Sequence, residues 1–380
     1  MQKKSEPIRI LQVVTHLNRN GLESRIMDIY RNVDRTKVQF DFMIHRNELG
    51  DFGEEIKSMG GRIYMMPRIS PRNFVKYLSK LDAFFAKNTE YKIVHVHLNT
   101  LSTWVLYKAK KYGVPIRIAH SRNASMEKNF RALPKTFSKL FINFVTTDRF
   151  ACSSMAGEWL FGKKYLNDTS FKVIPNAFDV DKFVWDESKR YKKRNELGIE
   201  NEDIVYISVA RLSEQKNHIY LLQIFEKIHK KDSRARLVLV GAGECEQKIK
   251  MFITEHYLQE CVIMLGSRAD VAELYMAADL FLFPSKYEGF GTVVIEAQVT
   301  HLPVLASDRI PSETKICDCV TFMSINDNVE NWAGLANEMV NNSKRYDNSK
   351  IIRDAGFDIR KQYRWMENYY ITKYEEATDN

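Results

Sequence analysis

Short apolar runs alternate with helical patterns along most of the chain, and the alternation starts again near residue 203. The first series of predicted strands covers residues 8–14, 39–45, 62–66, 93–97, 115–119, 150–152 and 171–174. The second covers 204–209, 235–240, 262–265, 280–283, 303–306 and, more weakly, 320–323. Strands that alternate with helices indicate parallel sheets. The sequence therefore predicts an α/β protein built from two Rossmann-like domains.

The length of 380 residues also favours two domains, because one core of ordinary size does not extend over so long a chain. We expect an N-terminal domain at 1–178 and a C-terminal domain at 179–360, followed by a helix at 361–380 that returns to the first domain. Residues 179–200 are highly charged and poor in aliphatic side chains, which is typical of a surface linker. The last helical pattern is expected to kink or break near Trp365.

A glycine turn lies between a predicted strand and a predicted helix in the segment Pro284-Ser-Lys-Tyr-Glu-Gly-Phe-Gly-Thr-Val-Val-Ile-Glu-Ala-Gln298. Such a turn points free backbone N–H groups and the positive helix end at one place, where a phosphate is the expected ligand. Glu288 lies at the mouth of the turn, and Glu296 is expected about two turns into the helix, roughly 12 Å along its axis. The alternative is a capped surface helix with two exposed glutamates.

Two cations follow the first strand of the second domain. Arg211 stands at the carboxyl end of that strand and Lys216 at the start of the next helix. Both are expected to face the same cleft as the glycine turn. Fixed cations beside backbone donors suit a diphosphate that gains charge as it leaves during a reaction. An ordinary basic loop is the alternative.

The next strand ends in Gly241-Ala-Gly243, which resembles a dinucleotide-binding fingerprint. The third glycine position is Glu246, and no acidic residue ends the following strand, so a nicotinamide or flavin site is disfavoured. The two glycines are expected to allow close approach of a ligand or tight backbone packing. Ser267 and Arg268, at the end of the following strand, are placed to border a nucleobase.

The first domain carries a second, weaker glycine turn and three histidines at strand ends. Gly21 lies in Asn18-Arg-Asn-Gly-Leu-Glu23, between the first strand and a helix. Because alternate residues of a strand share a face, His95 and His97 should point the same way. His120 lies just beyond its strand, and we expect it to contact a ligand, although a lone histidine more often has a structural role.

The formal net charge of +9 is concentrated between residues 108 and 139, where basic residues alternate with aromatic ones. This segment suits anionic lipid or an anionic substrate; nucleic acid is the weakest candidate because no known binding pattern accompanies the charges. The alternative is an ordinary solvent-exposed basic face without a binding role. The five cysteines lack metal-site spacing and are expected to be reduced thiols. Without an apolar leader or a bilayer-length apolar run, the sequence predicts a cytoplasmic protein, with contact at the inner leaflet as a further expectation.

Three motifs resemble the retaining GT-B glycosyltransferases of family four: the Arg-x4-Lys pair, the Glu-x7-Glu segment and Val173-Ile-Pro-Asn-Ala-Phe-Asp179. The opening Thr15-His-Leu-Asn-Arg-Asn-Gly-Leu-Glu23 is most similar to members that build bacterial capsular polysaccharides and exopolysaccharides. Two departures stand out. Asn20-Gly21 replaces the paired glycines that relatives often carry, and Ala177 follows Pro-Asn where glycine is common.

The resemblance implies two Rossmann-like domains whose parallel sheets face across a cleft, the first binding the acceptor and the second the nucleotide-sugar. Arg211 and Lys216 would hold the donor diphosphate, Glu296 the ribose and Glu288 the hydroxyls of the donor sugar. The remaining donor contacts are expected from Gly21, Gly241, Ser267, Arg268 and the backbone of Phe290, Gly291 and Thr292. His120 would border the transferred sugar. The family needs no metal and no cofactor.

The implied function is transfer of a hexose-type sugar from a nucleotide diphosphate, expected to be UDP, with retention of the anomeric configuration. The acceptor would be a glycan or a lipid-linked glycan in polysaccharide biosynthesis. Two alternatives remain at this point. One is a nucleotide-sugar epimerase or a phosphorylase on the same fold, and the other is a non-catalytic partner subunit.

Overall fold

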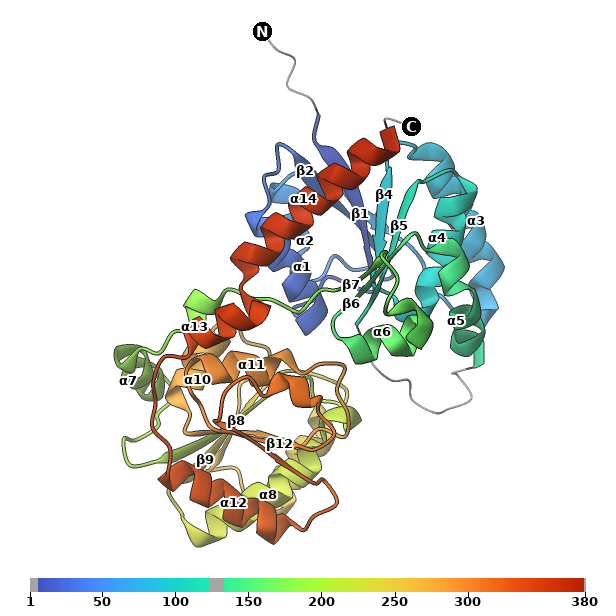
Figure 1. The fold of residues 1–380 in the computed structure, drawn as a ribbon. Coiled ribbons are helices and arrows are strands. Elements are labelled where there is room, and N and C mark those ends of the chain that lie inside the picture. Colours follow the sequence, from blue (N-terminus) through green and yellow to red (C-terminus); the bar gives the residue numbers. More distant parts are fainter. Residues whose placement is uncertain (1–5, 123–132, 379–380) are drawn as a thin grey trace. The chain divides into compact units, whose positions relative to one another are not determined.

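The computed structural model describes residues 6–122 and 133–378, which form two compact units. Unit 1 comprises Met1–Phe178 together with Ile359–Asn380, and unit 2 comprises Asp179–Asp358. Each unit contains one parallel sheet with helices packed against it (Figure 1). The predicted α/β class with two parallel sheets is confirmed.

The sheet of unit 1 has the strand order β3-β2-β1-β4-β5-β6-β7. Its strands are β1 (Ile8–Val14), β2 (Val38–Ile44), β3 (Ile63–Met65), β4 (Ile93–Val96), β5 (Ile116–Ser121), β6 (Asp148–Ala151) and β7 (Phe171–Val173). Its helices are α1 (Gly21–Asn32), α2 (Gly53–Ser58), α3 (Phe74–Lys87), α4 (Ser102–Lys111), α5 (Leu133–Val145), α6 (Ser154–Phe161) and α14 (Ile359–Thr378). Successive side chains of β1 enter different cores, because Ile10 packs with Phe40 while Leu11 packs with Tyr77. Both faces of this sheet are therefore covered.

The sheet of unit 2 has the order β10-β9-β8-β11-β12-β13. Its strands are β8 (Ile204–Val209), β9 (Ala235–Val240), β10 (Val262–Met264), β11 (Leu280–Phe283), β12 (Val304–Ser307) and β13 (Val320–Met323). Its helices are α7 (Glu187–Glu196), α8 (His218–Lys231), α9 (Glu246–Glu255), α10 (Val271–Ala277), α11 (Thr292–Val299), α12 (Val329–Asn341) and α13 (Ser349–Ile352). Trp332 of α12 is fully buried against Tyr206 and Leu280, in the core on one side of this sheet.

The charged segment 179–200 is part of unit 2 and not a linker. It contains α7, whose Arg194 is 1% exposed and donates to the carbonyl oxygens of Glu200 and Asp203, each at 2.6 Å. Arg190 donates to the Asp279 carboxylate at 2.7 Å. The linker prediction was wrong because these guanidinium groups, one buried and one partly buried, bond to carbonyls and a carboxylate of unit 2, which composition does not reveal.

The last helix, α14, lies along unit 1 next to α1, in red in Figure 1. It runs unbroken from Ile359 to Thr378, so the predicted kink near Trp365 is wrong. Trp365 instead stacks on Tyr369, with ring centroids 5.2 Å apart. The backbone deviates earlier, at Gly356, where φ is 92°. Among the helices of the described residues, none is both long enough and apolar enough to span a bilayer.

Candidate functional site

Each sheet reverses its strand order between its first strand and a later one, and ligands of open α/β sheets bind outside the carboxyl ends at such points. In unit 2 the reversal lies between β8 and β11. The loops that follow these two strands are residues 210–217 and 284–291. They carry Arg211, Lys216 and Glu288, so the topology places these three predicted site residues at one edge of the sheet.

Lys216 and Glu288 form an ion pair between the two loops. The Lys216 Nζ lies 2.5 Å from the Glu288 Oε1, and the side chains are only 17% and 7% exposed. The same ammonium lies 4.9 Å from the centroid of the Phe283 ring. A half-buried cation of this kind needs an anionic partner, and Glu288 supplies one where no ligand is bound. A phosphate oxygen would compete with Glu288 for Lys216.

Backbone-directed hydrogen bonds hold these two loops together. The Gln215 side-chain amide donates to the Tyr287 carbonyl at 2.8 Å, and the Lys286 N–H donates to the Gln215 carbonyl at 2.8 Å. Asn217 adopts the left-handed conformation, with φ 58°, and donates to the Pro284 carbonyl at 3.2 Å. Sequence reasoning missed Gln215 and Asn217. The available signal was an asparagine just before a helix, since asparagine tolerates this conformation better than most residues.

The glycine turn after β11 ends at Gly291, whose φ of 84° is left-handed, and α11 begins at Thr292. The first N–H groups of α11 have no partner inside the helix and lie at this end. Glu296 is the fifth residue of α11, one turn or roughly 6 Å along the axis, so the predicted two turns were wrong. Its side chain is buried, at 6% exposure. Phe290 is also buried and stacks on Phe357, with centroids 5.7 Å apart.

Arg211 differs from Lys216 because its side chain is 57% exposed and its ion pair, to Glu244 at 3.0 Å, lies at the surface. The loop that carries it packs tightly on the loop after β9. A Cβ added at Gly241, where φ is 137°, would lie 1.9 Å from the Ala210 carbonyl oxygen. A Cβ at Gly243 would lie 2.3 Å from the Leu212 carbonyl oxygen. The expectation of tight backbone packing at these glycines is confirmed.

The end of β10 presents an exposed Ser267 and a constrained Arg268. The Arg268 guanidinium donates to Asp270 at 2.8 and 2.6 Å and to Glu196 at 3.1 Å. The hydrogen bond from Arg268 is the main cause that lowers the pKa of Asp270 below its usual value. Arg268 is therefore held by carboxylates of its own unit.

In unit 1 the strand order reverses between β1 and β4, and the Gly21 turn follows β1. Asn20 is extended, with φ −113°, and a Cβ added at Gly21 would meet nothing within 4 Å. The replacement of paired glycines by Asn20-Gly21 therefore causes no backbone strain. Glu23, in the first turn of α1, is 4% exposed, and burial raises its pKa to about 7. Its Oε1 lies 3.3 Å from the His16 Nδ1.

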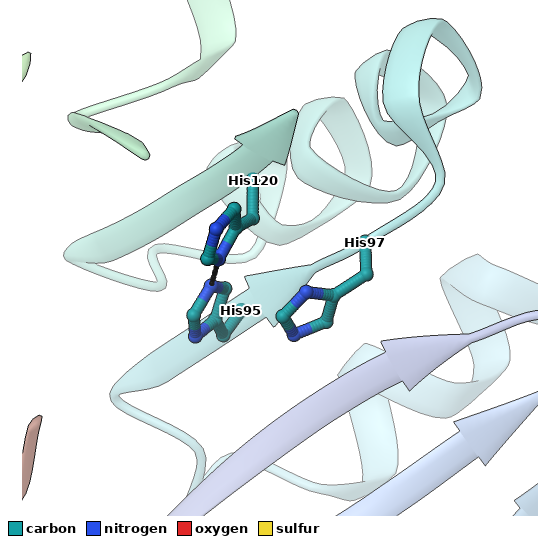
Figure 2. Close-up of side chains that lie close together, drawn as sticks. All are labelled: His95, His97 and His120. Atoms are coloured by element: carbon teal, nitrogen blue, oxygen red, sulfur yellow. Dashed lines mark hydrogen bonds between the residues drawn. The ribbon is translucent and has the colours of Figure 1, made fainter. Parts of the chain in front are cut away.

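The three histidines of unit 1 lie together (Figure 2), and His120 lies within β5, so its predicted position just beyond the strand was wrong. His95 and His97 share a side, as predicted, with ring centroids 4.2 Å apart. The His95 Nε2 and the His120 Nδ1 are 3.0 Å apart. All three side chains are at most 4% exposed, and burial lowers each pKa well below its usual value, so the rings are neutral at pH 7.

The predicted basic face at 108–139 is only partly a surface. Lys108 is buried and donates to Asp82 at 2.6 Å, and Arg117 donates to the Val145 carbonyl at 2.8 Å. Arg122 is partly buried beside His97. These three cations were misassigned because a charge run does not reveal which side chains turn inward. Lys110 and Lys111 are exposed, whereas Lys128 and Arg131 lie outside the described residues.

Comparisons with known proteins agree with this arrangement. The family model of glycosyl transferases group 1 matches residues 189–352. A Bacillus subtilis (strain 168) protein named as a glycosyltransferase, EpsF, is 31% identical over 329 residues, covering 86% of each chain. The capsular polysaccharide biosynthesis glycosyltransferase CapH of Staphylococcus aureus is 24% identical, covering 96% of this chain and 99% of that one.

A solved structure of Anabaena Alr3699/HepE in complex with UDP and glucose is similar in fold. Its TM-score is 0.76 at 19% identity, covering 96% of this chain and 99% of that chain. The fold is therefore GT-B, and the chain belongs to the group 1 glycosyltransferases.

Proposed function

We propose that the protein transfers a hexose-type sugar from a UDP-sugar to a glycan or lipid-linked acceptor in polysaccharide biosynthesis, retaining the anomeric configuration and using no metal or cofactor. The observation that carries this proposal is the Lys216–Glu288 pair at the switch point of unit 2. The names of EpsF and CapH support the glycosyl transfer, and the name of CapH supports the polysaccharide pathway. The UDP and glucose bound by HepE support the choice of nucleotide and sugar.

The chemistry follows from an exchange of ionic partners. The donor diphosphate replaces Glu288 beside Lys216, and Arg211 leaves Glu244 to bind the same phosphates. Cations that meet growing negative charge stabilise the transition state more than the ground state. The N–H groups at the start of α11 add donors to the same phosphates. In this proposal the departing phosphate accepts the proton of the acceptor hydroxyl, so no protein base is needed there.

The carboxylates then hold the sugars at the two ends of the pyrophosphate. Glu288, released from Lys216, accepts hydrogen bonds from hydroxyls of the donor hexose. Glu296 accepts those of the ribose from its buried position on α11. Gly241, Ser267 and Arg268 border the nucleoside, while Gly21 and His120 of unit 1 are assigned to the donor phosphate and the transferred sugar.

An anionic membrane is the proposed partner of the exposed face of α5. Its apolar side chains Phe137, Leu140, Phe141 and Phe144 recur at helical spacing and are 42–72% exposed. Lys110 lies beside them, because its Nζ bonds the Phe144 carbonyl at 2.9 Å. An apolar stripe flanked by lysines suits the interface of an anionic bilayer, where lipid-linked acceptors are found.

Single-turnover release of UDP tests the enzymatic proposal. UDP-sugars are first screened by thermal shift, because a ligand of the native state raises its melting temperature. The best donor is then mixed with excess protein, with and without glycan acceptor. Acceptor-dependent UDP release with retained configuration is expected. Acceptor-independent interconversion of the sugar would indicate an epimerase, phosphate-dependent cleavage a phosphorylase, and no turnover a partner subunit.

Vesicle co-sedimentation tests the membrane contact. Binding to anionic vesicles that weakens with salt is expected, and Phe144→Glu should abolish it. Met251→Glu is the matched control, because Met251 is also an exposed apolar side chain, at 57% against 72% for Phe144, on α9 of unit 2. Equal binding to neutral vesicles, or unchanged binding by the Phe144 variant, would contradict this partner.

A further inference from the structure

The buried histidines of unit 1 belong to a hydrogen-bond network whose protons can be assigned one by one, starting from Arg122. A guanidinium has five donors and no acceptor. The Arg122 Nε and Nη2 both lie 3.4 Å from the His97 Nδ1. That nitrogen must therefore carry a lone pair. Because His97 is neutral, its single ring proton is on Nε2.

The assignment continues through Gln12 to the last helix. The His97 Nε2–H donates to the Gln12 Oε1 at 3.0 Å, which fixes the orientation of that amide. The Gln12 Nε2 then donates to the Tyr370 hydroxyl oxygen at 3.1 Å. Tyr370 has one proton of its own, and the His95 Nδ1 lies 2.7 Å from its oxygen. No other acceptor for that proton is found among the described residues, so the tyrosine donates and the His95 Nδ1 accepts.

The last step fixes His120. Neutral His95 carries its proton on Nε2 and donates it to the His120 Nδ1 at 3.0 Å, the contact drawn in Figure 2. Neutral His120 then carries its own proton on Nε2. This buried Nε2 has no hydrogen-bond partner among the described residues. An unpaired buried donor is costly, so the network holds a proton ready for an acceptor.

A metal site is the competing interpretation of the same three rings. One ligand nitrogen from each of His95, His97 and His120 lies within 4.8 Å of the others. A metal needs an unused lone pair on each ring. Here the lone pairs accept from Tyr370, Arg122 and His95 respectively, and the adjacent, partly buried Arg122 cation would repel a divalent ion. The network therefore favours a hydrogen-bond donor over a metal.

We propose that Arg122, Gln12 and Tyr370 are positioning residues that fix His120 as an Nε2–H donor toward a ligand oxygen. That this ligand is the donor sugar or its acceptor rests on the proposed function. His120 is accordingly a donor to an oxygen and not a base that removes a proton. The return of α14 supplies Tyr370, which lies 275 residues from His95 in the sequence, so the last helix determines the proton position of a residue on β5.

Nuclear magnetic resonance of ring-15N-histidine protein tests the assignment directly. In the wild type, the His120 Nε2 signal should be of the protonated, pyrrole type and its Nδ1 of the pyridine type. His120→Gln identifies the signals. A pyridine-type His120 Nε2 in the wild type would overturn the proposal. Added Zn²⁺ should leave the three histidine signals unchanged, and a joint shift of all three would establish the metal interpretation instead.

Gln12→Glu reverses the network without changing its shape. A carboxylate cannot donate, so it accepts the Tyr370 proton, and the tyrosine oxygen must then accept from the His95 Nδ1. His95 presents a lone pair at Nε2, His120 donates from Nδ1, and its own Nε2 becomes a lone pair. The His120 Nε2 signal should change to the pyridine type. Turnover should fall about tenfold, which corresponds to the loss of one hydrogen bond. An unchanged His120 Nε2 signal in the folded variant would contradict the network.

Tyr370→Phe is the second test of the network if Gln12→Glu does not fold. It removes the donor that fixes His95, so the His120 signals should move toward a mixture of both tautomers, with a few-fold loss of kcat at unchanged affinity for UDP. Tyr369→Phe is the matched control, because the neighbouring Tyr369 donates to Asp148 at 2.5 Å, outside the network. Histidine signals that move equally in both variants would indicate a general packing effect and overturn the proposal.

The magnetic resonance readout needs no substrate, which separates this inference from the proposed function. Predicted tautomers in a protein without sugar transfer would refute the function and leave the network intact. Sugar transfer by a protein with other tautomers would support the function and refute the network.

Discussion

The two units share the same strand order around the switch point but differ in the charge of the side chains at the carboxyl ends of their strands. In unit 1 this edge holds buried neutral histidines and the buried Glu23, with Arg122 as a cation that contacts His97. In unit 2 it holds charged pairs, Lys216–Glu288 and Arg211–Glu244, of which the second is exposed. The fold sets where a ligand can bind, and the side chains decide whether the edge presents neutral hydrogen bonds or charge.

The difference is also one of backbone freedom. Gly21 of unit 1 has room for a side chain, whereas Gly241 of unit 2 lies against the Ala210 carbonyl with φ 137°. The loop after β8 in unit 2 is therefore held by close backbone contact at Gly241. Unit 1 has a close contact of its own, since a Cβ at Gly50 would lie 2.9 Å from the Leu17 carbonyl oxygen, but at Gly21 it has room for a side chain.

The largest expected effect is on turnover by Lys216→Ala. Loss of a cation from the departing diphosphate should lower kcat by about 10²–10³-fold. Lys286→Ala is the matched control, because Lys286 is 45% exposed and pairs only loosely with Glu214, at 3.6 Å. Steady-state kinetics of the two variants measures the loss of kcat in each. Equal losses in the two would mean that charge in general, and not the switch-point pair, supports the reaction.

A pair of glycine substitutions sharpens the contrast in backbone freedom. Gly241→Ala should lower the free energy of unfolding by roughly 3–4 kcal/mol, from left-handed strain and the clash with Ala210. Gly21→Ala should leave it unchanged or raise it by about 0.5 kcal/mol, because alanine fits that helix start. Urea denaturation of both variants measures the difference. Similar losses would refute the contrast.

The pH dependence of stability tests whether the buried Glu23 carboxyl of unit 1 is protonated in the folded state. The Glu23 pKa is raised from 4.5 to about 7, so between these values the unfolded chain ionises while the folded one keeps its proton. Stability should fall as pH rises through this window, by at most about 3 kcal/mol.

Glu23→Gln should lack this loss. Urea denaturation of the wild type and the variant from pH 4.5 to 8 isolates the carboxyl, because the buried histidines are common to both and act in the opposite direction, destabilising the fold as pH falls. Parallel curves for the two proteins would show that Glu23 is not protonated in the folded state.

The smallest effect is expected at the end of β10. Arg268 pairs with carboxylates at partly exposed positions, and such pairs contribute below about 1 kcal/mol. Arg268→Ala should therefore change the free energy of unfolding by less than that, and any loss of UDP affinity should be below about tenfold. Thermal denaturation and titration with UDP measure both. A large loss of stability would show that the Arg268 cluster is structural.

Most of the fold could be predicted because buried parallel strands are continuous apolar runs. The bounds of β1, β8 and β11 match the predicted ranges. The failures have specific physical causes. In the segment 179–200, Arg194 is buried and Arg190 is partly buried, both bonded to carbonyls and a carboxylate, and charge composition predicts the opposite.

The candidate site was predictable where a residue follows its own strand, as Lys216 and Glu288 do. Contacts between elements that are distant in the sequence were not predictable. Tyr370 reaches His95 only because α14 returns to unit 1, and Gln215 bonds Tyr287 only because β8 and β11 are neighbours. Local patterns give no sign of either contact.

Calorimetric titration of UDP tests the central claim most directly, that the charged edge of unit 2 exchanges Glu288 for a diphosphate at Lys216. Lys216→Ala should bind UDP at least about tenfold more weakly than the wild type, since a charge-assisted bond is lost. Glu288→Gln should bind UDP as tightly as the wild type or more tightly, because it no longer competes for Lys216. Equal affinity of the wild type and Lys216→Ala, or weaker binding only in Glu288→Gln, would contradict the account.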